Sequence, residues 1–161
     1  MMLRIIFLLL IFFSFTNYSY SASSSSDGGS KSNYNKAANL IKAAKKYESK
    51  GKNEKAKKRY EKALNLLIKS NKEKPNQADT LNYLGFTTRK LGNYEEGEKY
   101  YLLGLKIDPN HKGINEYLGE LYVVTNRIEL AKQRLDVLKN CNCEVYKDLK
   151  DIIDGNKKSK Y

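Results

Sequence analysis

The chain has 161 residues, with 30 Lys or Arg against 18 Asp or Glu, and its formal net charge is +12. It contains one histidine, His111, and no cysteine lies near that histidine in sequence. This composition excludes the common zinc spacings and disfavours nucleophile–histidine catalysis. We therefore expect a protein that is not an enzyme and holds no cofactor or metal, with His111 exposed near a helix start.

The chain begins with the apolar segment MMLRIIFLLLIFF, which carries one cation, Arg4. The segment is too short to span a bilayer and is followed by polar residues, which is typical of a secretory signal. We predict a signal peptide over 1–21 and export, most simply to the periplasm, with no stable membrane span after its removal. Secretion and a retained signal anchor are the alternatives. Export also argues against nucleic acid as a partner.

Residues 22–33 are rich in Ser and Gly and predict a disordered linker. After them, the apolar spacing predicts an all-α domain over 34–154. Six of its helices are expected near 34–50, 53–72, 77–91, 94–107, 112–125 and 127–140. Residues 155–161 should form a disordered tail.

A repeated pattern surrounds three turn positions, Gly51, Gly92 and Asn126, which are 41 and then 34 residues apart. A small residue follows each turn by five positions, and a large residue follows four positions later. These pairs are Ala56 with Tyr60, Gly97 with Tyr101, and Ala131 with Leu135. Small residues at such places let helices approach closely, so the glycines are interpreted as packing positions.

The second copy of this pattern has Leu84, Gly85, Gly97, Tyr101 and Pro109 at the positions of a known signature. It resembles the tetratricopeptide repeat. The resemblance implies a right-handed superhelix of three helix–turn–helix repeats over about 37–76, 78–111 and 112–143. Asn93 and Asn126 are expected as N-caps, since each precedes a glutamate by three residues.

Cys141 and Cys143 form an isolated C-x-C after the last repeat helix. In an exported chain they predict a local disulfide, with a free or intermolecular pair, or a thiol-redox or copper-handling role, as alternatives. Residues 144–154 place apolar side chains on one helical stripe and predict a C-terminal capping helix. That stripe consists of Val145, Leu149, Ile152 and Ile153.

The family resemblance implies a concave groove for a protein or peptide partner, lined by exposed side chains of the first helix in each pair. These are Lys45, Asn82, Tyr83, Phe86, Arg89, Lys90, Glu116 and Glu120. Of these, Phe86 with Arg89 and Lys90 is the expected anchor, because an exposed aromatic ring beside two cations suits an extended acidic peptide. Family members that bind chaperone tails use a carboxylate clamp of Lys, Asn and Arg side chains. The corresponding places here hold Ile41, Lys45, Tyr83, Gly113 and Tyr117, which argues against a chaperone tail as the ligand. A peripheral envelope protein that binds anionic surfaces through its lysines is the other alternative, and the oligomeric state is open.

Overall fold

The structure is a computed structural model that describes residues 32–159. The predicted signal peptide, 1–21, and all but the end of the predicted linker lie outside the described residues. Everything described belongs to one compact unit of the chain, Lys31–Tyr161. Among the described residues, no helix has the length and apolar character needed to cross a membrane.

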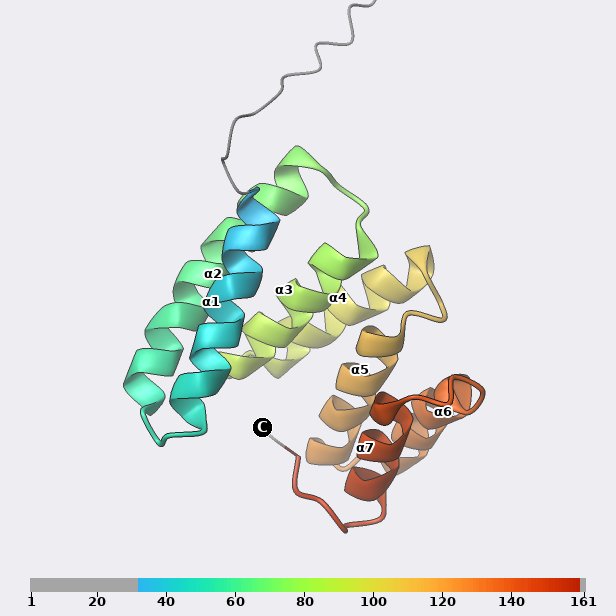
Figure 1. Cartoon of the computed structure of the whole chain (residues 1–161). Helices are drawn as coiled ribbons and strands as arrows, with labels where there is room; N and C mark the ends of the chain where they lie inside the picture. The colour runs from blue at the N-terminus through green and yellow to red at the C-terminus, as the bar shows by residue number, and fades with distance from the viewer. Residues whose placement is uncertain (1–31, 160–161) are drawn as a thin grey trace, which may run out of the picture. The chain divides into compact units, whose positions relative to one another are not determined.

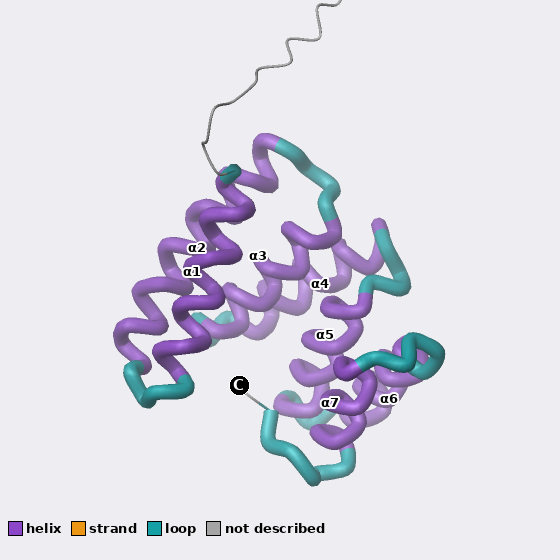
Figure 2. The backbone as a smooth tube through the Cα atoms, viewed as in Figure 1, coloured by secondary structure: helices purple, strands orange, loops and turns teal. Residues whose placement is uncertain are grey.

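Seven helices and no strand make up residues 32–159, as Figures 1 and 2 show. The expected all-α class is therefore confirmed. The helices are α1 (Asn33–Glu48), α2 (Asn53–Glu73), α3 (Ala78–Lys90), α4 (Tyr94–Ile107), α5 (Lys112–Val124), α6 (Ile128–Leu138) and α7 (Glu144–Ile153).

The first six helices form three consecutive antiparallel pairs, α1 with α2, α3 with α4, and α5 with α6. The first helices of the pairs also meet, because α3 contacts both α1 and α5. Helix α7 packs against α5 and α6. This arrangement gathers α1, α3 and α5 on one side of the domain.

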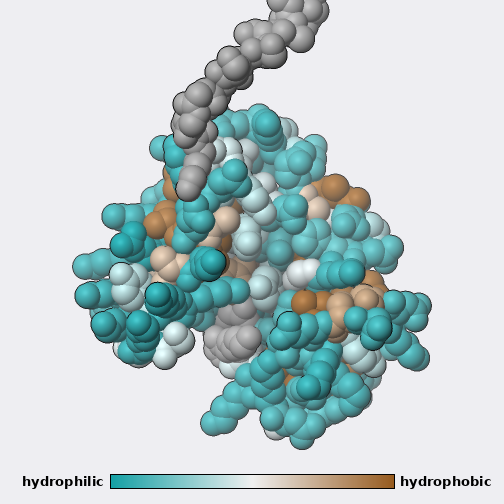
Figure 3. All heavy atoms as spheres, in the orientation of Figure 1, coloured by the Kyte–Doolittle hydropathy of each residue, from teal (hydrophilic) through white to brown (hydrophobic). Residues whose placement is uncertain are grey.

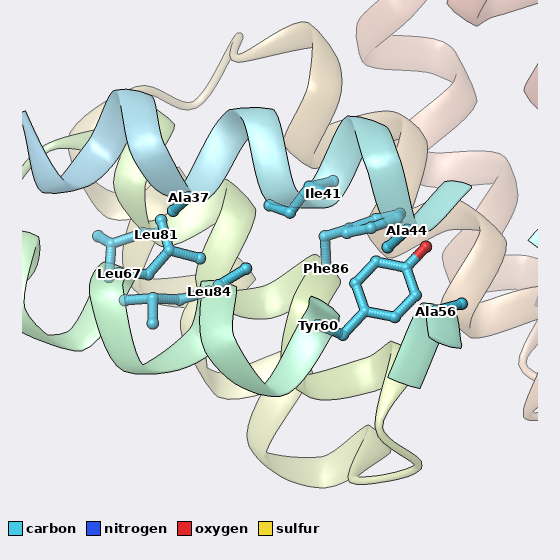
Figure 4. Packing of buried hydrophobic residues seen from close by; sticks show 10 residues of the cluster. Ala37, Ile41, Ala44, Ala56, Tyr60, Leu67, Leu81, Leu84 and Phe86 are labelled. Carbon is cyan, nitrogen blue, oxygen red and sulfur yellow. The ribbon is translucent and has the colours of Figure 1, made fainter. Parts of the chain in front are cut away.

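A core of small and large side chains joins the first pair to α3 (Figure 4). Alanines of α1 and α2 sit where the two helices approach, and Tyr60 and Leu67 fill the spaces beside them. From α3, Leu81, Leu84 and Phe86 complete the cluster. A second cluster, around Tyr101, joins α4 to α5 and α6. The repeat pattern of small and large residues at fixed spacing predicts this kind of packing, in which large side chains fill the spaces beside small ones.

The three turns within the pairs share one backbone feature. Gly51, Gly92 and Asn126 all adopt positive φ, at 67°, 92° and 57°. Glycine adopts this left-handed region without strain, and asparagine tolerates it better than most residues. The expectation that Asn126 caps α6 is therefore wrong, since Asn126 occupies the place of Gly92, and Arg127 is the N-cap. The expected N-cap at Asn93 is confirmed, because its side chain accepts a hydrogen bond from the Glu96 backbone N–H.

Helix α3 packs closely on α4 at Gly85. A methyl group at this position would lie 2.6 Å from two ring carbons of Tyr101, and that ring is fully buried. We expect Gly85→Ala to lower the free energy of unfolding by roughly 1–3 kcal/mol through overpacking. Denaturant unfolding measures the effect, and Lys106→Ala, at an exposed site of α4, is the control. Equal losses in the two variants would contradict this packing.

Helix α7 covers the third pair and buries part of its apolar stripe. Leu149 and Ile152 are buried, and Val145 and Ile153 are half-buried. Leu149 packs directly on Gly119 of α5, where a methyl group would lie 2.6 Å from Leu149 Cδ2. A disulfide joins Cys141 to Cys143 in the connection before α7, with the two Cα atoms 5.2 Å apart.

Candidate functional site

The face shared by α1, α3 and α5 is the candidate site, and we call it the inner face. It is defined by Lys45, Tyr83, Phe86, Lys90, Glu116 and Tyr117. The 34-residue repeat explains part of this grouping, because Tyr83 and Tyr117 are 34 residues apart and so occupy equivalent places. In Figure 3 hydrophilic residues make up most of the coloured surface in view, with apolar colour in smaller patches.

Lys45 connects all three inner helices. Its Nζ lies 4.4 Å from the centre of the Phe86 ring and 5.3 Å from that of Tyr117. The same ammonium group donates a hydrogen bond to the Tyr117 hydroxyl at 3.1 Å. The two rings are themselves 5.0 Å apart. A cation held over aromatic faces in this way gains about 0.5–2 kcal/mol, depending on how fully it is desolvated.

The surroundings of Lys45 change its acid–base behaviour and that of its neighbours. Partial desolvation of the Lys45 side chain, part of which stays exposed, lowers the pKa of its ammonium group, while Tyr83 and Glu116 act in the opposite direction. Burial also raises the pKa of the Tyr117 hydroxyl to about 12, and Glu116 adds to the increase. Near neutral pH the tyrosine is therefore a neutral donor or acceptor beside a cation.

Several predicted groove residues are not exposed. Phe86 and Arg89 are each 1% exposed, Glu120 is 3% exposed and Asn82 is 8% exposed. The expectation that Phe86 is an exposed anchor is therefore wrong. Its ring is enclosed by Tyr60 from α2 and Tyr117 from α5, with Lys45 above it. Lys45 is exposed, and Tyr83, Lys90 and Glu116 are half-buried.

Arg89 and Glu120 form a buried ion pair between α3 and α5. Arg89 Nη2 lies 3.3 Å from Glu120 Oε2, and Arg89 Nη1 donates to the Tyr117 carbonyl oxygen at 2.6 Å. Both side chains are almost completely excluded from solvent. Such a pair fixes the register of α3 on α5, because each charge depends on its neighbour for compensation.

A second ion pair joins α3 to the first helix pair. Lys90 Nζ lies 2.7 Å from Glu48 Oε1, and the other oxygen of Glu48 accepts a hydrogen bond from the Tyr60 hydroxyl at 2.9 Å. Lys90 is therefore a structural partner of Glu48 as well as a member of the inner face.

The expected lining of the groove did not include Tyr34 or Tyr117, although Tyr117 occupies one of the clamp places named above. Tyr34 stacks against Tyr83 with ring centres 5.6 Å apart, and Tyr117 stacks against Phe86. The repeat register supports Tyr117 as a lining residue, since it is equivalent to Tyr83. No sequence signal marked Tyr34, which lies at the start of α1 before the repeat pattern begins.

His111 is the N-cap of α5. Its Nδ1 accepts a hydrogen bond from the Ile114 N–H, and its Nε2 lies 3.1 Å from Asp79 Oδ1. The expected position at a helix start is confirmed. The expected solvent exposure is wrong, because only 14% of the side chain is accessible.

The residues that would serve the alternative functions, the cysteine pair and a group of basic side chains on α2, lie outside the inner face. Within residues 32–159, no group of three His, Cys, Asp or Glu side chains is arranged to hold a metal ion. The basic side chains Lys55, Lys58, Arg59 and Lys62 of α2 gather around Tyr47 and line a small pocket. Binding to anionic surfaces through these side chains stays a prediction.

The family model described as tetratricopeptide repeat matches residues 78–111. The chain carries a tetratricopeptide repeat. The match spans α3, α4 and the turn between them, together with the connection to α5. Comparison with curated proteins found no match.

Solved tetratricopeptide-repeat structures share the fold. The first such domain of Spaghetti (RPAP3), bound to an HSP90 peptide, is 18% identical, with a TM-score of 0.54 over 76% of this chain and 94% of that one. The Sgt2 domain from Aspergillus fumigatus is 15% identical, with a TM-score of 0.55 over 74% and 78%. The type III secretion translocator chaperone SycD of Yersinia enterocolitica is 15% identical, with a TM-score of 0.54 over 73% and 81%. At these identities the likeness establishes the helical-repeat fold alone.

Proposed function

We propose that this protein is a non-enzymatic tetratricopeptide-repeat adaptor that binds an extended peptide segment of a partner on its inner face. The arrangement of Lys45 over Phe86 and Tyr117 carries the proposal. It presents an accessible cation beside the half-buried ring of Tyr117, at a point where three helices meet. That combination suits a segment with an acidic group next to an apolar side chain.

Two further observations support a binding role. The fold is shared with a domain whose structure was determined with an HSP90 peptide and with a second RPAP3 domain determined with an HSP70 peptide. The inner face is also held rigidly, because the Arg89–Glu120 and Lys90–Glu48 pairs fix the helices that carry it. A preorganised face loses less entropy when a ligand binds.

The proposed place of action is outside the cytoplasm, in the periplasm or envelope. The apolar segment at 1–13 and the Ser/Gly-rich stretch after it support this location. An extracytoplasmic adaptor also suits the disulfide between Cys141 and Cys143, since disulfides persist in oxidising compartments.

Selection from a random dodecapeptide library, followed by titration of the selected peptides, tests the proposal. We expect Lys45→Glu to weaken binding by about tenfold or more, which corresponds to about 1.4 kcal/mol. Lys69→Glu makes the same charge change at an exposed site of α2 and should change affinity less than about twofold, since exposed charges far from a ligand are screened. Equal effects of the two substitutions, or a library that yields no binder, would contradict the proposal.

A further inference from the structure

The excess cations of the described domain are concentrated in its first helix pair. Residues 32–74, which contain α1 and α2, hold 14 Lys or Arg against four Asp or Glu, a net charge of +10. Residues 75–159 hold 13 of each and have no net charge. Helices α1 and α2 form one end of the array, beside α3 (Figure 1). The positive potential of the domain therefore arises at that end.

Four of these cations surround one hollow on α2, which we call the basic pocket. Lys55, Lys58, Arg59 and Lys62 line it together with Tyr47 of α1, and its volume is about 180 Å³. The three lysines are exposed, and Arg59 and Tyr47 are half-buried. Residues three and four positions apart lie on the same face of an α-helix, so α2 presents all four cations together.

Every side chain that lines the basic pocket can donate a hydrogen bond, since ammonium and guanidinium groups are donors and the phenol of Tyr47 carries an O–H. Among the described side chains, none that lines the pocket carries a carboxylate, and none of its four cations takes part in an ion pair. Like charges gathered in this way repel one another, and an anion bound between them removes the repulsion. A phosphate group suits the pocket, because its oxygens accept hydrogen bonds from guanidinium and ammonium groups.

The basic pocket is separate from the inner face. Lys45 of the inner face and Tyr47 are two positions apart on α1, which places them about 200° apart around the helix. Glu48 and Glu54 line a different hollow, together with Lys90 of α3. The carboxylates of the first pair that are closest in sequence to the turn between α1 and α2 are therefore directed away from the basic pocket.

We propose that the basic pocket binds the phosphate of an anionic lipid headgroup, so that the first helix pair rests on a membrane surface. A surface that carries many phosphates matches this helix pair better than one soluble ion does, because a single phosphate cannot balance a net charge of +10. The half-buried ring of Tyr47 also suits the headgroup region, where an apolar body and a polar tip are both accommodated. The inner face stays accessible in this arrangement, and the inference does not rest on peptide binding there.

Sedimentation with lipid vesicles tests the proposal. The full chain and a chain of residues 31–161, which is a compact unit by itself, are each mixed with vesicles of phosphatidylglycerol and phosphatidylcholine or of phosphatidylcholine alone. The shorter chain lacks the apolar segment of residues 1–13, so its binding reports on the domain alone. We expect both chains to prefer the anionic vesicles. The preference should decrease between about 0.1 M and 1 M salt, since the screening length falls from about 10 Å to 3 Å.

Two matched double variants locate the contact. Arg59→Gln with Lys62→Gln removes two cations from the basic pocket and keeps residues that favour a helix. A cation near an anionic surface strengthens binding about fivefold, so this variant should bind anionic vesicles about 25-fold more weakly. Lys106→Gln with Lys139→Gln removes the same charge at exposed sites outside the first helix pair and should change binding less than about twofold. Circular dichroism checks that both variants keep their helices.

The proposal fails if neither chain prefers anionic vesicles, or if the two double variants weaken binding equally. It also fails if the chain ignores vesicles but binds inorganic phosphate in a way that Arg59→Gln abolishes, because free phosphate is then the ligand. The same pattern with polyglutamate in place of phosphate would assign the pocket to an acidic protein. None of these outcomes affects peptide binding at the inner face, which Lys45→Glu tests separately.

Discussion

Truncation of the chain after Asn140 is expected to leave a protein that is nearly unfolded. The deletion removes α7, whose Leu149 and Ile152 are buried against α5 and α6. Burial of each apolar side chain contributes about 1.5–3 kcal/mol before ordering entropy is subtracted. The whole stability of a domain is about 5–15 kcal/mol, so loss of this stripe removes a large share of it. Thermal melting followed by circular dichroism measures the loss.

The matched control replaces both Cys141 and Cys143 by serine. A bridge over one intervening residue restrains only a short loop, so its removal should cost much less than truncation. The melting temperatures should decrease in the order intact, double-serine and truncated. A double-serine protein as unstable as the truncated one would show that the cysteines contribute more than a local bridge.

Arg89→Met is expected to destabilise the domain by about 3–5 kcal/mol, since it removes the cation beside a buried carboxylate. Glu120 is 3% exposed and lies 3.3 Å from the Arg89 guanidinium group. The substitution also removes the hydrogen bond to the Tyr117 carbonyl oxygen. Urea unfolding gives the change in free energy.

The double variant Arg89→Met, Glu120→Leu separates loss of charge compensation from loss of packing. Replacement of both charges by apolar side chains of similar size should recover much of the stability. The single variants Arg89→Met and Glu120→Leu are measured as well. If the stability lost in the double variant equals the sum of the two single losses, the two charges are not coupled, and our account of this contact fails.

Local patterns in the sequence were sufficient to predict the helices. The small residues at Gly85 and Gly97, the turn glycines and the 34-residue spacing are properties of nearby residues, and they predicted the paired helices to within two residues at each end. The turn at Asn126 shows a limit of this reasoning. Asparagine suits both an N-cap and a left-handed turn, and only the backbone shows that it adopts the second.

The exposure of the predicted site residues could not be read from the sequence. Phe86 and Arg89 lie on the side of α3 that faces α5. Their burial depends on Tyr117 and Glu120, which approach from α5. The packing partner of Gly119 could not be read from the sequence either, because the atoms nearest to it belong to Leu149 of α7, outside its own helix pair.

By itself, therefore, the sequence determined the helical class, the repeat register and the capping role of the last helix, since amphipathic spacing and small packing residues act over one or two helices. The tertiary structure alone decided which polar residues became buried pairs and which cation remained accessible on the inner face. These features depend on contacts between helices far apart in the chain, and no local pattern encodes them.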